Sequence, residues 1–315
     1  MAELKLYDVT MRDGGLVNDF RFEDSFVRRL YETNCQAGID YMEIGYRADK
    51  KLFAPADFGP WKFSSDDDIR RVIGEKGSTR ICIMTDVRRT DLNDIHPAAE
   101  SPVDLIRVAT YIDTLPEAMR LMEHASQMGY ETTCNIMAIS RATDEQIREA
   151  LRQLATSPAT SVFIVDSYGA LLPTQTRHIT EIYREALAGT GKQVGIHCHN
   201  NLQCAFANTL EAIHSGATMA DATLYGMGRG AGNCHMEQLG GYLSGQSTTA
   251  GAYKIEPLLR MVETDMLALK ARGPEWGYNT SFMLTGLTNQ HPRVAIQATR
   301  GEEHDFVAQY RNESV

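Results

Sequence analysis

Short apolar runs alternate along this chain with longer segments in which apolar residues recur every three or four positions. Short β-branched-rich runs predict strands, and the wider spacing predicts helices. We expect strands over residues 4–9, 41–45, 79–85, 104–110, 131–138, 161–166, 193–201 and 219–226. We expect helices over residues 25–37, 115–128 and 143–154, from Pro173 onward, and from Leu202 to just before Gly216.

Eight strand–helix units in succession, with no internal repeat, predict a parallel (β/α)8 TIM barrel. An open doubly wound sheet is the alternative, and the length of about 240 residues favours closure. We therefore expect a barrel domain over residues 1–250 and a C-terminal extension over 251–315 that packs on the barrel. That extension should open with a helix at about 254–271 and continue as an irregular tail. The polar and aromatic segment 46–64 is expected to be a long loop that covers a site.

Composition excludes several classes of protein. The 315 residues carry a formal charge of −10, which argues against a nucleic-acid binder. No apolar run approaches the roughly 20 residues that span a membrane, and the N-terminal segment does not resemble a signal peptide. The six cysteines form no C-x-x-C pair, so we expect reduced thiols in a cytoplasmic protein.

Polar residues follow the apolar core of successive predicted strands. They are Arg12 and Asp13 after the first strand, Glu43 in the second, Asn135 in the fifth, Asp166 and Ser167 at the end of the sixth, and His197 and His199 in the seventh. Active sites of TIM barrels lie at the carboxyl ends of the strands, where these side chains would converge.

The segment "HCHNN" gives the strongest chemical signal. Its two histidines, His197 and His199, are two positions apart and would project to one face of a strand. Taken alone, such a pair is as often a buried polar pair as a metal site. Strands seven, eight and one are neighbours in a closed barrel, which brings Asp13 to the same place. Two histidines and one carboxylate suit a divalent metal with open positions.

The glycine-rich segment "GMGRGAGN" (226–233) follows the last predicted strand. A dinucleotide-binding loop would follow the first strand of a βαβ unit instead. We therefore expect a loop whose backbone approaches a metal-bound substrate, with Asn233 adding an amide oxygen to the metal. Arg12 would then stabilise the negative charge of an enolate. Glu43 either orients Arg12 or is a structural carboxylate, and the sequence leaves both open.

The motifs "DVTMRDGG", "MEIG", "VDSYGALLP", "GIHCHNN" and "DATLYGMGRGAGN" together resemble a superfamily of metal-dependent TIM-barrel enzymes. It includes 3-hydroxy-3-methylglutaryl-CoA lyase, isopropylmalate and homocitrate synthases, and 4-hydroxy-2-oxovalerate aldolase, which the chain resembles most. The resemblance covers about residues 4–240. It implies Asp13, His197 and His199 as metal ligands and Asn233 as a further or neighbouring ligand. It also implies Arg12 as the enolate-stabilising residue, Glu43 as its partner, and Ser167 as a contact to the substrate carboxylate. From its place at the end of the fifth strand, Asn135 is a further candidate for substrate binding.

The chain departs from these relatives at one important position. The aldolases carry a histidine three places after the metal aspartate, where it serves as general base, and this chain has Leu16 there. The loop cysteine of the lyases is missing, and Cys234 does not replace it by position. The tail segment "WGYNTSFM" resembles the substrate-contacting tyrosine segment of the aldolases, which makes Tyr278 a candidate acid, base or positioning residue. His235 and His291 are weaker candidates.

These features together predict a carbon–carbon lyase, a metal-dependent aldolase that cleaves or forms a 4-hydroxy-2-oxo acid through a pyruvate enolate. Mn²⁺ is the expected metal, with Co²⁺, Zn²⁺ or Mg²⁺ as alternatives. Two other functions stay open: a Claisen-type synthase joining an acyl-CoA to a 2-oxo acid, and an inactive barrel that serves as a partner subunit. We also expect a homodimer and an aldehyde-processing partner enzyme.

Overall fold

Eight parallel strands form the centre of the molecule. The computed structural model describes residues 3–246, 248–249, 251–273, 275–298 and 305–313. The strands are Lys5–Asp8 (β1), Tyr41–Tyr46 (β2), Arg80–Asp86 (β3), Leu105–Thr110 (β4), Glu131–Ile136 (β5), Ser161–Asp166 (β6), Gln193–Cys198 (β7) and Met219–Ala222 (β8). They pair in chain order, and β8 pairs with β1, so the sheet closes. The predicted TIM barrel is confirmed, and the open sheet is excluded.

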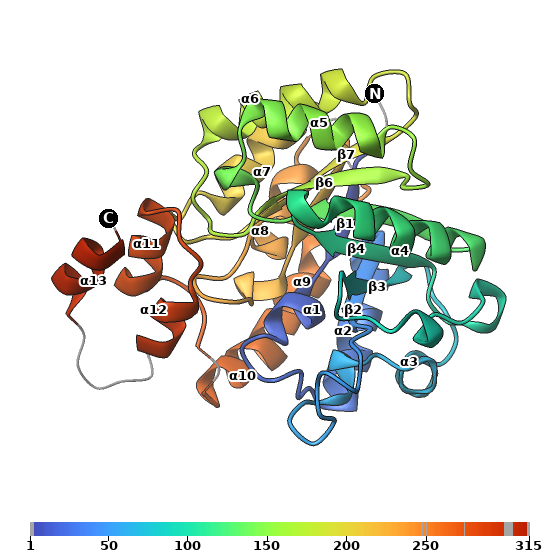
Figure 1. Cartoon of the computed structure of the whole chain (residues 1–315). Coiled ribbons are helices and arrows are strands. Elements are labelled where there is room, and N and C mark those ends of the chain that lie inside the picture. The colour runs from blue at the N-terminus through green and yellow to red at the C-terminus, as the bar shows by residue number, and fades with distance from the viewer. Residues whose placement is uncertain (1–2, 247, 250, 274, 299–304, 314–315) are drawn as a thin grey trace.

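Helices cover the outside of the barrel between the strands (Figure 1). They are Asp24–Ala37 (α2), Asp66–Ile73 (α3), Leu115–Gln127 (α4), Asp144–Leu154 (α5), Pro173–Ala186 (α6), Ala205–His214 (α7) and Met236–Ser244 (α8). Short 3₁₀ turns occupy Pro60–Lys62, Leu92–Asp94, Ala98–Glu100, Ile112–Thr114, Ile139–Arg141 and Leu224–Gly226. The Thr143 hydroxyl caps the backbone N–H of Gln146 at the start of α5, and Gly38 ends α2 with a left-handed φ of 77°.

Three strands end earlier than the sequence pattern predicts. Strand β5 stops at Ile136, β7 at Cys198 and β8 at Ala222. Beyond these points the chain continues as loops in which most residues are still buried. Burial in a loop gives the same run of apolar residues as a strand, so the sequence pattern does not show where the strand ends. On β6 and β7, the site residues Ser167, His197 and His199 therefore lie within one residue of the end of the strand.

Large side chains fill the interior of the barrel near the amino-terminal ends of its strands. Tyr7, Tyr41, Leu105, Phe163 and Met219 form one buried cluster. The rings of Tyr7 and Tyr41 stack with centroids 4.3 Å apart, and Phe163 meets Tyr7 edge-on at 5.5 Å. This packing fills the amino-terminal part of the barrel, and the pocket described below lies at the carboxyl ends of the strands.

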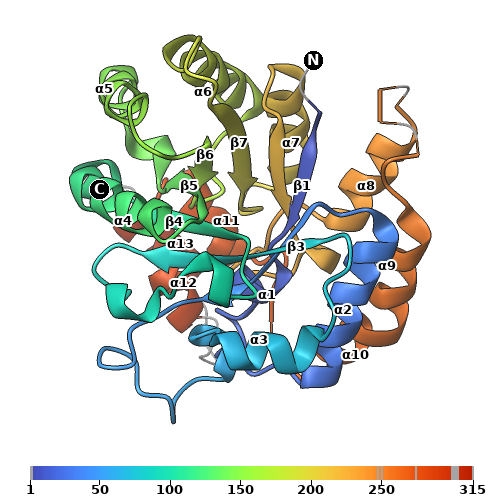
Figure 2. The ribbon, with the colours of Figure 1, turned by 90° about the vertical axis from the view of Figure 1, so that its right-hand side faces the viewer.

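The chain beyond residue 250 is largely helical. Ile255–Met261 (α9), a π-helical turn Val262–Met266 and Leu267–Ala271 (α10) run beside α2 on the outside of the barrel (Figure 2). The tail predicted as irregular instead contains Thr280–Leu287 (α11), Arg293–Ala298 (α12) and Phe306–Glu313 (α13). Asn279 caps α11 by accepting a hydrogen bond from the backbone N–H of Ser281. The domain boundary at residue 250 stays a prediction.

Candidate active site

The segment "DVTMRDGG" leaves β1 and forms a single helical turn, Thr10–Gly14 (α1). Arg12 and Asp13 lie on this turn and are buried. The two glycines do not serve a left-handed turn, since Gly15 has a φ of −58°. They allow close packing, because a Cβ atom at Gly14 would lie 2.8 Å from the Met227 sulfur and one at Gly15 would clash with the Phe20 ring.

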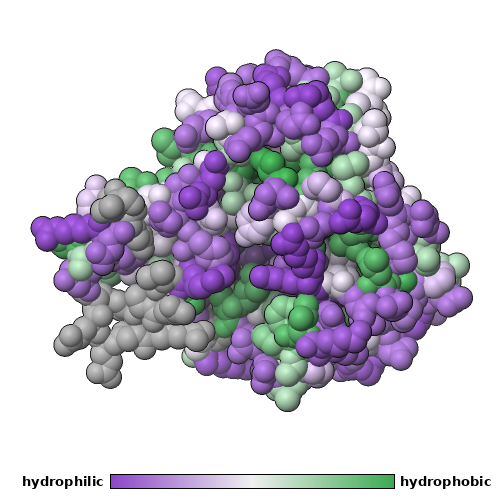
Figure 3. Space-filling view, viewed as in Figure 1, coloured by the Kyte–Doolittle hydropathy of each residue, from purple (hydrophilic) through white to green (hydrophobic). Residues whose placement is uncertain are grey.

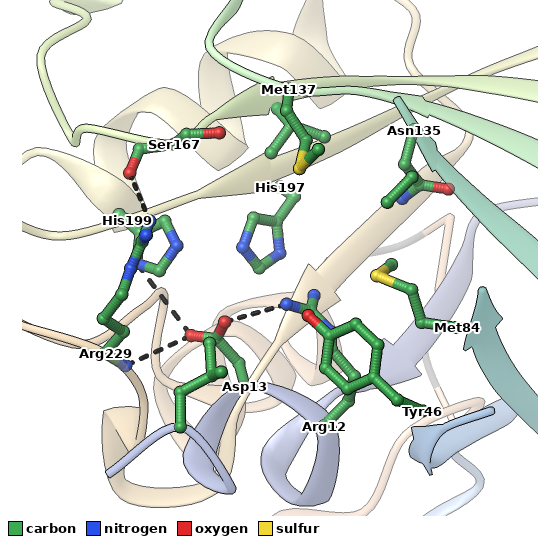
Figure 4. A pocket seen from close by; sticks show the side chains of 13 residues that line it. Arg12, Asp13, Tyr46, Met84, Asn135, Met137, Ser167, His197, His199 and Arg229 are labelled. Carbon is green, nitrogen blue, oxygen red and sulfur yellow. Dashed lines mark hydrogen bonds and ion pairs between the residues drawn. The ribbon is translucent and has the colours of Figure 1, made fainter. Parts of the chain in front are cut away.

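Asp13, His197 and His199 meet at the mouth of the barrel. One ligand atom of each lies within 4.8 Å of the others, and all three residues are at least 95% buried. Figure 4 shows their side chains facing a common point. Strands β7, β8 and β1 bring them together, as barrel closure predicts. This donor set of one carboxylate and two imidazoles fits a divalent transition metal.

The hydrogen bonds of the two histidines favour metal binding. Nδ1 of His197 lies 3.1 Å from a carboxylate oxygen of Asp221, and Nδ1 of His199 lies 3.3 Å from the carbonyl oxygen of Gly232. Because both partner oxygens accept hydrogen bonds, each Nδ1 carries the proton and each Nε2 keeps its lone pair for a metal. Burial lowers the pKa of His199 well below its usual value, which keeps that ring neutral.

Asn233 sits against Asp13 rather than apart from it. Its Nδ2 donates to a carboxylate oxygen of Asp13 at 2.6 Å and to the Met227 carbonyl at 3.2 Å. Its Oδ1 is buried and has no hydrogen-bond partner among the described residues. An unpaired buried oxygen beside the three ligands fits a further position on a cation. At Gly228 a Cβ atom would clash with both Asn233 and Asp13, so only glycine lets the loop approach this closely.

The Asp13 carboxyl group is held in its charged form. Burial alone would raise its pKa, but His199 and Arg12 lower it below the usual range. Since His199 is itself neutral, we attribute the lowering to Arg12, whose Nη1 donates to Asp13 at 2.8 Å. Asp13 is therefore ionised at neutral pH, as a metal ligand must be.

Arg12 is fixed by a second carboxylate. Its Nε donates to Glu43 at 2.7 Å, and Glu43 also lies 3.2 Å from Nη1 of the buried Arg107. Glu43 is fully buried, so it is not a solvated carboxylate at the end of a strand. The ion pairs from Asp13 through Arg12 to Glu43 set the direction of the Arg12 guanidinium.

A pocket of about 80 Å³ opens above these residues. Its lining comprises Arg12, Asp13, Leu16, Tyr46, Met84, Ala109, Asn135, Met137, Val165, Ser167, His197, His199 and Arg229. On the face shown in Figure 3, hydrophilic residues surround a hollow near the centre. The pocket mixes apolar walls with a few convergent polar groups, as small-molecule sites do.

Most of the predicted site residues lie together, and Tyr278 does not. Asn135 and Ser167 line the pocket, and the Ser167 hydroxyl accepts a hydrogen bond from the backbone N–H of Ala138. Tyr278 is 64% exposed and lies outside the pocket lining, so we leave it out of the catalytic set. Nε2 of His291 lies 2.9 Å from Nη1 of Arg229. Neither His291 nor His235 is among the residues that line the pocket.

Sequence reasoning missed several residues of this site. Arg229 lines the pocket and donates to the Ser167 carbonyl oxygen at 2.8 Å, and Tyr46 forms another wall. Arg107 and Asp221 form a buried ion pair below the ligands. A signal for this pair was present, since each interrupts an otherwise apolar strand, and a charge buried in this way needs a partner.

The fold and the site together define a class: TIM-barrel enzymes in which an Asp-His-His set that could hold a metal ion lies beside a buried arginine. The chain belongs to the HMGL-like family, whose model matches residues 3–264. It is 31% identical over 300 residues to an oxaloacetate decarboxylase of Mycobacterium tuberculosis, covering 92% of this chain and 85% of that protein. It is 28% identical over 236 residues to a 4-hydroxy-2-oxovalerate aldolase of Bacillus cereus, covering 75% and 68%.

Solved structures agree with this assignment. The N-terminal domain of a protein proposed to be an aldolase, from Bacteroides vulgatus, matches with a TM-score of 0.82 and 26% identity over 98% of this chain and 100% of that one. The hydroxymethylglutaryl-CoA lyase of Pseudomonas aeruginosa shares the fold, with a TM-score of 0.71 and 19% identity over 88% and 95%. The predicted superfamily and the prediction of a carbon–carbon lyase are confirmed by these relatives.

Proposed function

We propose that this chain breaks the C3–C4 bond of a 2-oxo acid and releases pyruvate by way of its enolate. The observation that carries the proposal is the buried set of Asp13, His197 and His199, with the Arg12 guanidinium held in the same pocket. A divalent cation bound there would act as a Lewis acid on the 2-oxo and carboxylate oxygens of the substrate. Breaking the bond leaves an electron pair on C3, which the adjacent carbonyl group draws onto its oxygen.

Arg12 is the residue that we assign to the developing enolate oxygen. Its guanidinium is already oriented by Asp13 and Glu43, so no reorganisation is needed as negative charge appears. Asn135 and Ser167 lie across the pocket, where their side chains can bind the substrate carboxylate. These two assignments, like that of Asn233 to the metal, are part of the proposal.

Tyr46 is the proton donor that we assign to the enolate carbon. Figure 4 shows its hydroxyl beside the Arg12 guanidinium, and both residues line the pocket. Burial raises the pKa of Tyr46 to about 12, with Arg12 opposing the rise, so the hydroxyl keeps its proton at neutral pH. A phenol in this state can donate to C3 once the bond has broken.

The leaving fragment decides between two reactions. Aldol cleavage of a 4-hydroxy-2-oxo acid also requires a base for the hydroxyl proton. Leu16 lines the pocket at the position where the aldolases resembled by this chain carry their histidine. Decarboxylation of a 2-oxo acid with a carboxylate on C3 needs no such base. Leu16 therefore favours decarboxylation as the second candidate function.

The test is pyruvate release by the purified protein with Mn²⁺, assayed with lactate dehydrogenase and NADH. The substrates are 4-hydroxy-2-oxopentanoate and oxaloacetate, the latter corrected for its decarboxylation by Mn²⁺ alone. Pyruvate from either substrate should be lost in Asp13→Ala and kept in Asp67→Ala, whose carboxylate is 98% exposed. Failure with both substrates would overturn the lyase assignment. Release of a free thiol from acetyl-CoA and a 2-oxo acid would indicate the synthase, and absence of metal binding would indicate an inactive barrel.

We further propose Mn²⁺ as the metal, because two imidazoles disfavour Mg²⁺, which prefers oxygen ligands. A cytoplasmic location, a homodimer and a partner enzyme that takes up an aldehyde product remain predictions. Among the described helices, none has the length and apolar character needed to cross a membrane.

A further inference from the structure

A lysine lies buried in the long loop that joins β2 to α3. Lys62 ends the 3₁₀ turn Pro60–Lys62, and only 8% of its surface is exposed. Its ammonium group is surrounded by four aromatic rings. The distances from Nζ to the ring centroids are 4.2 Å for Phe53, 4.9 Å for Tyr46, 5.0 Å for Phe20 and 5.4 Å for Phe58. Such rings favour a cation but provide no counter-ion.

No hydrogen bond or ion pair joins the Lys62 ammonium to any residue that the structure describes. Burial lowers the pKa of Lys62 to about 8, Arg89 lowers it further, and Asp86 opposes the shift. Asp86 is itself paired with Arg89 at 3.2 Å. A buried cation without its own carboxylate is costly, and binding an anion would offset that cost.

The ammonium lies beside a small cavity of about 60 Å³ that adjoins the catalytic pocket. Leu16 and Tyr46 line both spaces, so these two side chains form the wall between them. The charged groups that line the cavity are Lys62, Arg89 and Asp86. Two cations and one carboxylate leave an excess of one positive charge in this cavity, which lies beyond Leu16 and Tyr46 from the catalytic pocket.

We propose that this cavity is a subsite for a carboxylate at the far end of the substrate, with Lys62 and Arg89 as its cationic groups. For the aldol reaction, the preferred 2-oxo acids are then diacids, in which the fragment beyond the broken bond carries its own carboxylate. The inference rests on the proposed function, because it assumes that the 2-oxo end occupies the pocket at Asp13, His197 and His199. The aromatic rings surround the Lys62 ammonium group itself, which meets the cavity beside the Tyr46 ring.

A matched pair of uncleavable ligands tests the subsite directly. 2-Oxoglutarate and 2-oxopentanoate have the same five-carbon chain and differ only in a terminal carboxylate or methyl group. Calorimetric titration of the full chain loaded with Mn²⁺ should show 2-oxoglutarate binding about tenfold more tightly or better, the range of a hydrogen bond to a charged group. In Lys62→Gln the preference should fall to about threefold or less. Lys51→Gln, an exposed lysine of the same loop, should keep it.

Arg89→Gln gives an independent variant that we expect to fold, because the Arg89 side chain is 59% exposed. It should also weaken the preference, even if Lys62→Gln does not fold. Equal binding of the two ligands by the wild-type protein, or an unchanged preference in both variants, would overturn the subsite and leave the proposed function standing. Failure of both ligands to bind would overturn the proposed function as well.

Discussion

Nη2 of Arg107 on β4 donates hydrogen bonds to both carboxylate oxygens of Asp221 on β8, each at 2.9 Å. The pair crosses the inside of the barrel, and both side chains are completely buried. The guanidinium lies against the rings of Tyr7 and Phe163, at 4.8 and 4.4 Å from their centroids. Asp221 in turn holds Nδ1 of His197. The pair therefore connects the packed interior of the barrel to one of the proposed metal ligands.

Asp221→Asn should weaken metal binding, since it removes the carboxylate that orients His197. Loss of such a partner typically costs 10- to 100-fold in metal affinity, and we expect a fall of about that size. Titration of the metal-free protein with Mn²⁺ measures it. The variant should also lose about 1–3 kcal/mol of unfolding free energy, because Arg107 loses the carboxylate that accepts its two hydrogen bonds and keeps only Glu43, which it shares with Arg12.

The double variant Arg107→Met with Asp221→Asn separates these two effects. It should recover part of the stability in urea unfolding, because it removes the buried guanidinium whose hydrogen bonds to Asp221 are lost, and it should still bind Mn²⁺ weakly. Wild-type metal affinity in Asp221→Asn would show that the pair stabilises the barrel without positioning His197.

Leu16→His should introduce aldol activity or increase it. Leu16 is 40% exposed and lines the catalytic pocket, so the larger polar ring can be accommodated. A base at this place would accept the 4-hydroxyl proton, and general-base catalysis contributes about 10²- to 10⁴-fold. Pyruvate release from 4-hydroxy-2-oxopentanoate is the measurement, and Leu16→Gln is the control with a polar group but no base. An equal gain in both variants would contradict the role of the imidazole.

Tyr46→Phe should lower kcat by about 10²-fold and change KM little, because it removes a hydroxyl and keeps the ring that packs against Lys62. Pyruvate formed in D₂O reports the proton transfer itself. The wild-type protein should place deuterium on C3 at its rate of turnover, and in the variant this step should become rate-limiting. Unchanged kcat would remove Tyr46 from the proposed mechanism.

Lys62 should make stability depend on pH above neutrality. The folded protein releases this proton near pH 8, whereas the unfolded chain holds it to an ordinary lysine pKa of about 10.5. Between these values the unfolded state binds more protons, so wild-type stability rises with pH. Relative to Lys62→Met, the wild type should gain on the order of 1–3 kcal/mol between pH 7.5 and 10. Urea unfolding of both proteins measures the difference, and parallel curves would contradict the assignment.

Local pattern was enough to predict the barrel and much of the site. Each strand and helix carries its own periodicity, and a polar residue just past an apolar strand marks the functional end of a TIM barrel. Asp13, His197 and His199 could be placed together because closure makes β7, β8 and β1 neighbours. The pattern failed at strand ends and in the tail, where buried loops and short helices show the same apolar spacing.

By itself, the sequence determined the order of the elements, the closed barrel and the donor set at its mouth, because these depend on residues near in sequence or on a repeated unit. Only the tertiary structure decided the partners: Arg107 with Asp221, Asn233 with Asp13, and Lys62 within its aromatic rings. It also decided that the glycines of "DVTMRDGG" serve close packing instead of a turn. Contacts between distant segments depend on the direction in which each side chain points after the chain has packed. The local pattern of apolar and polar residues does not specify that direction.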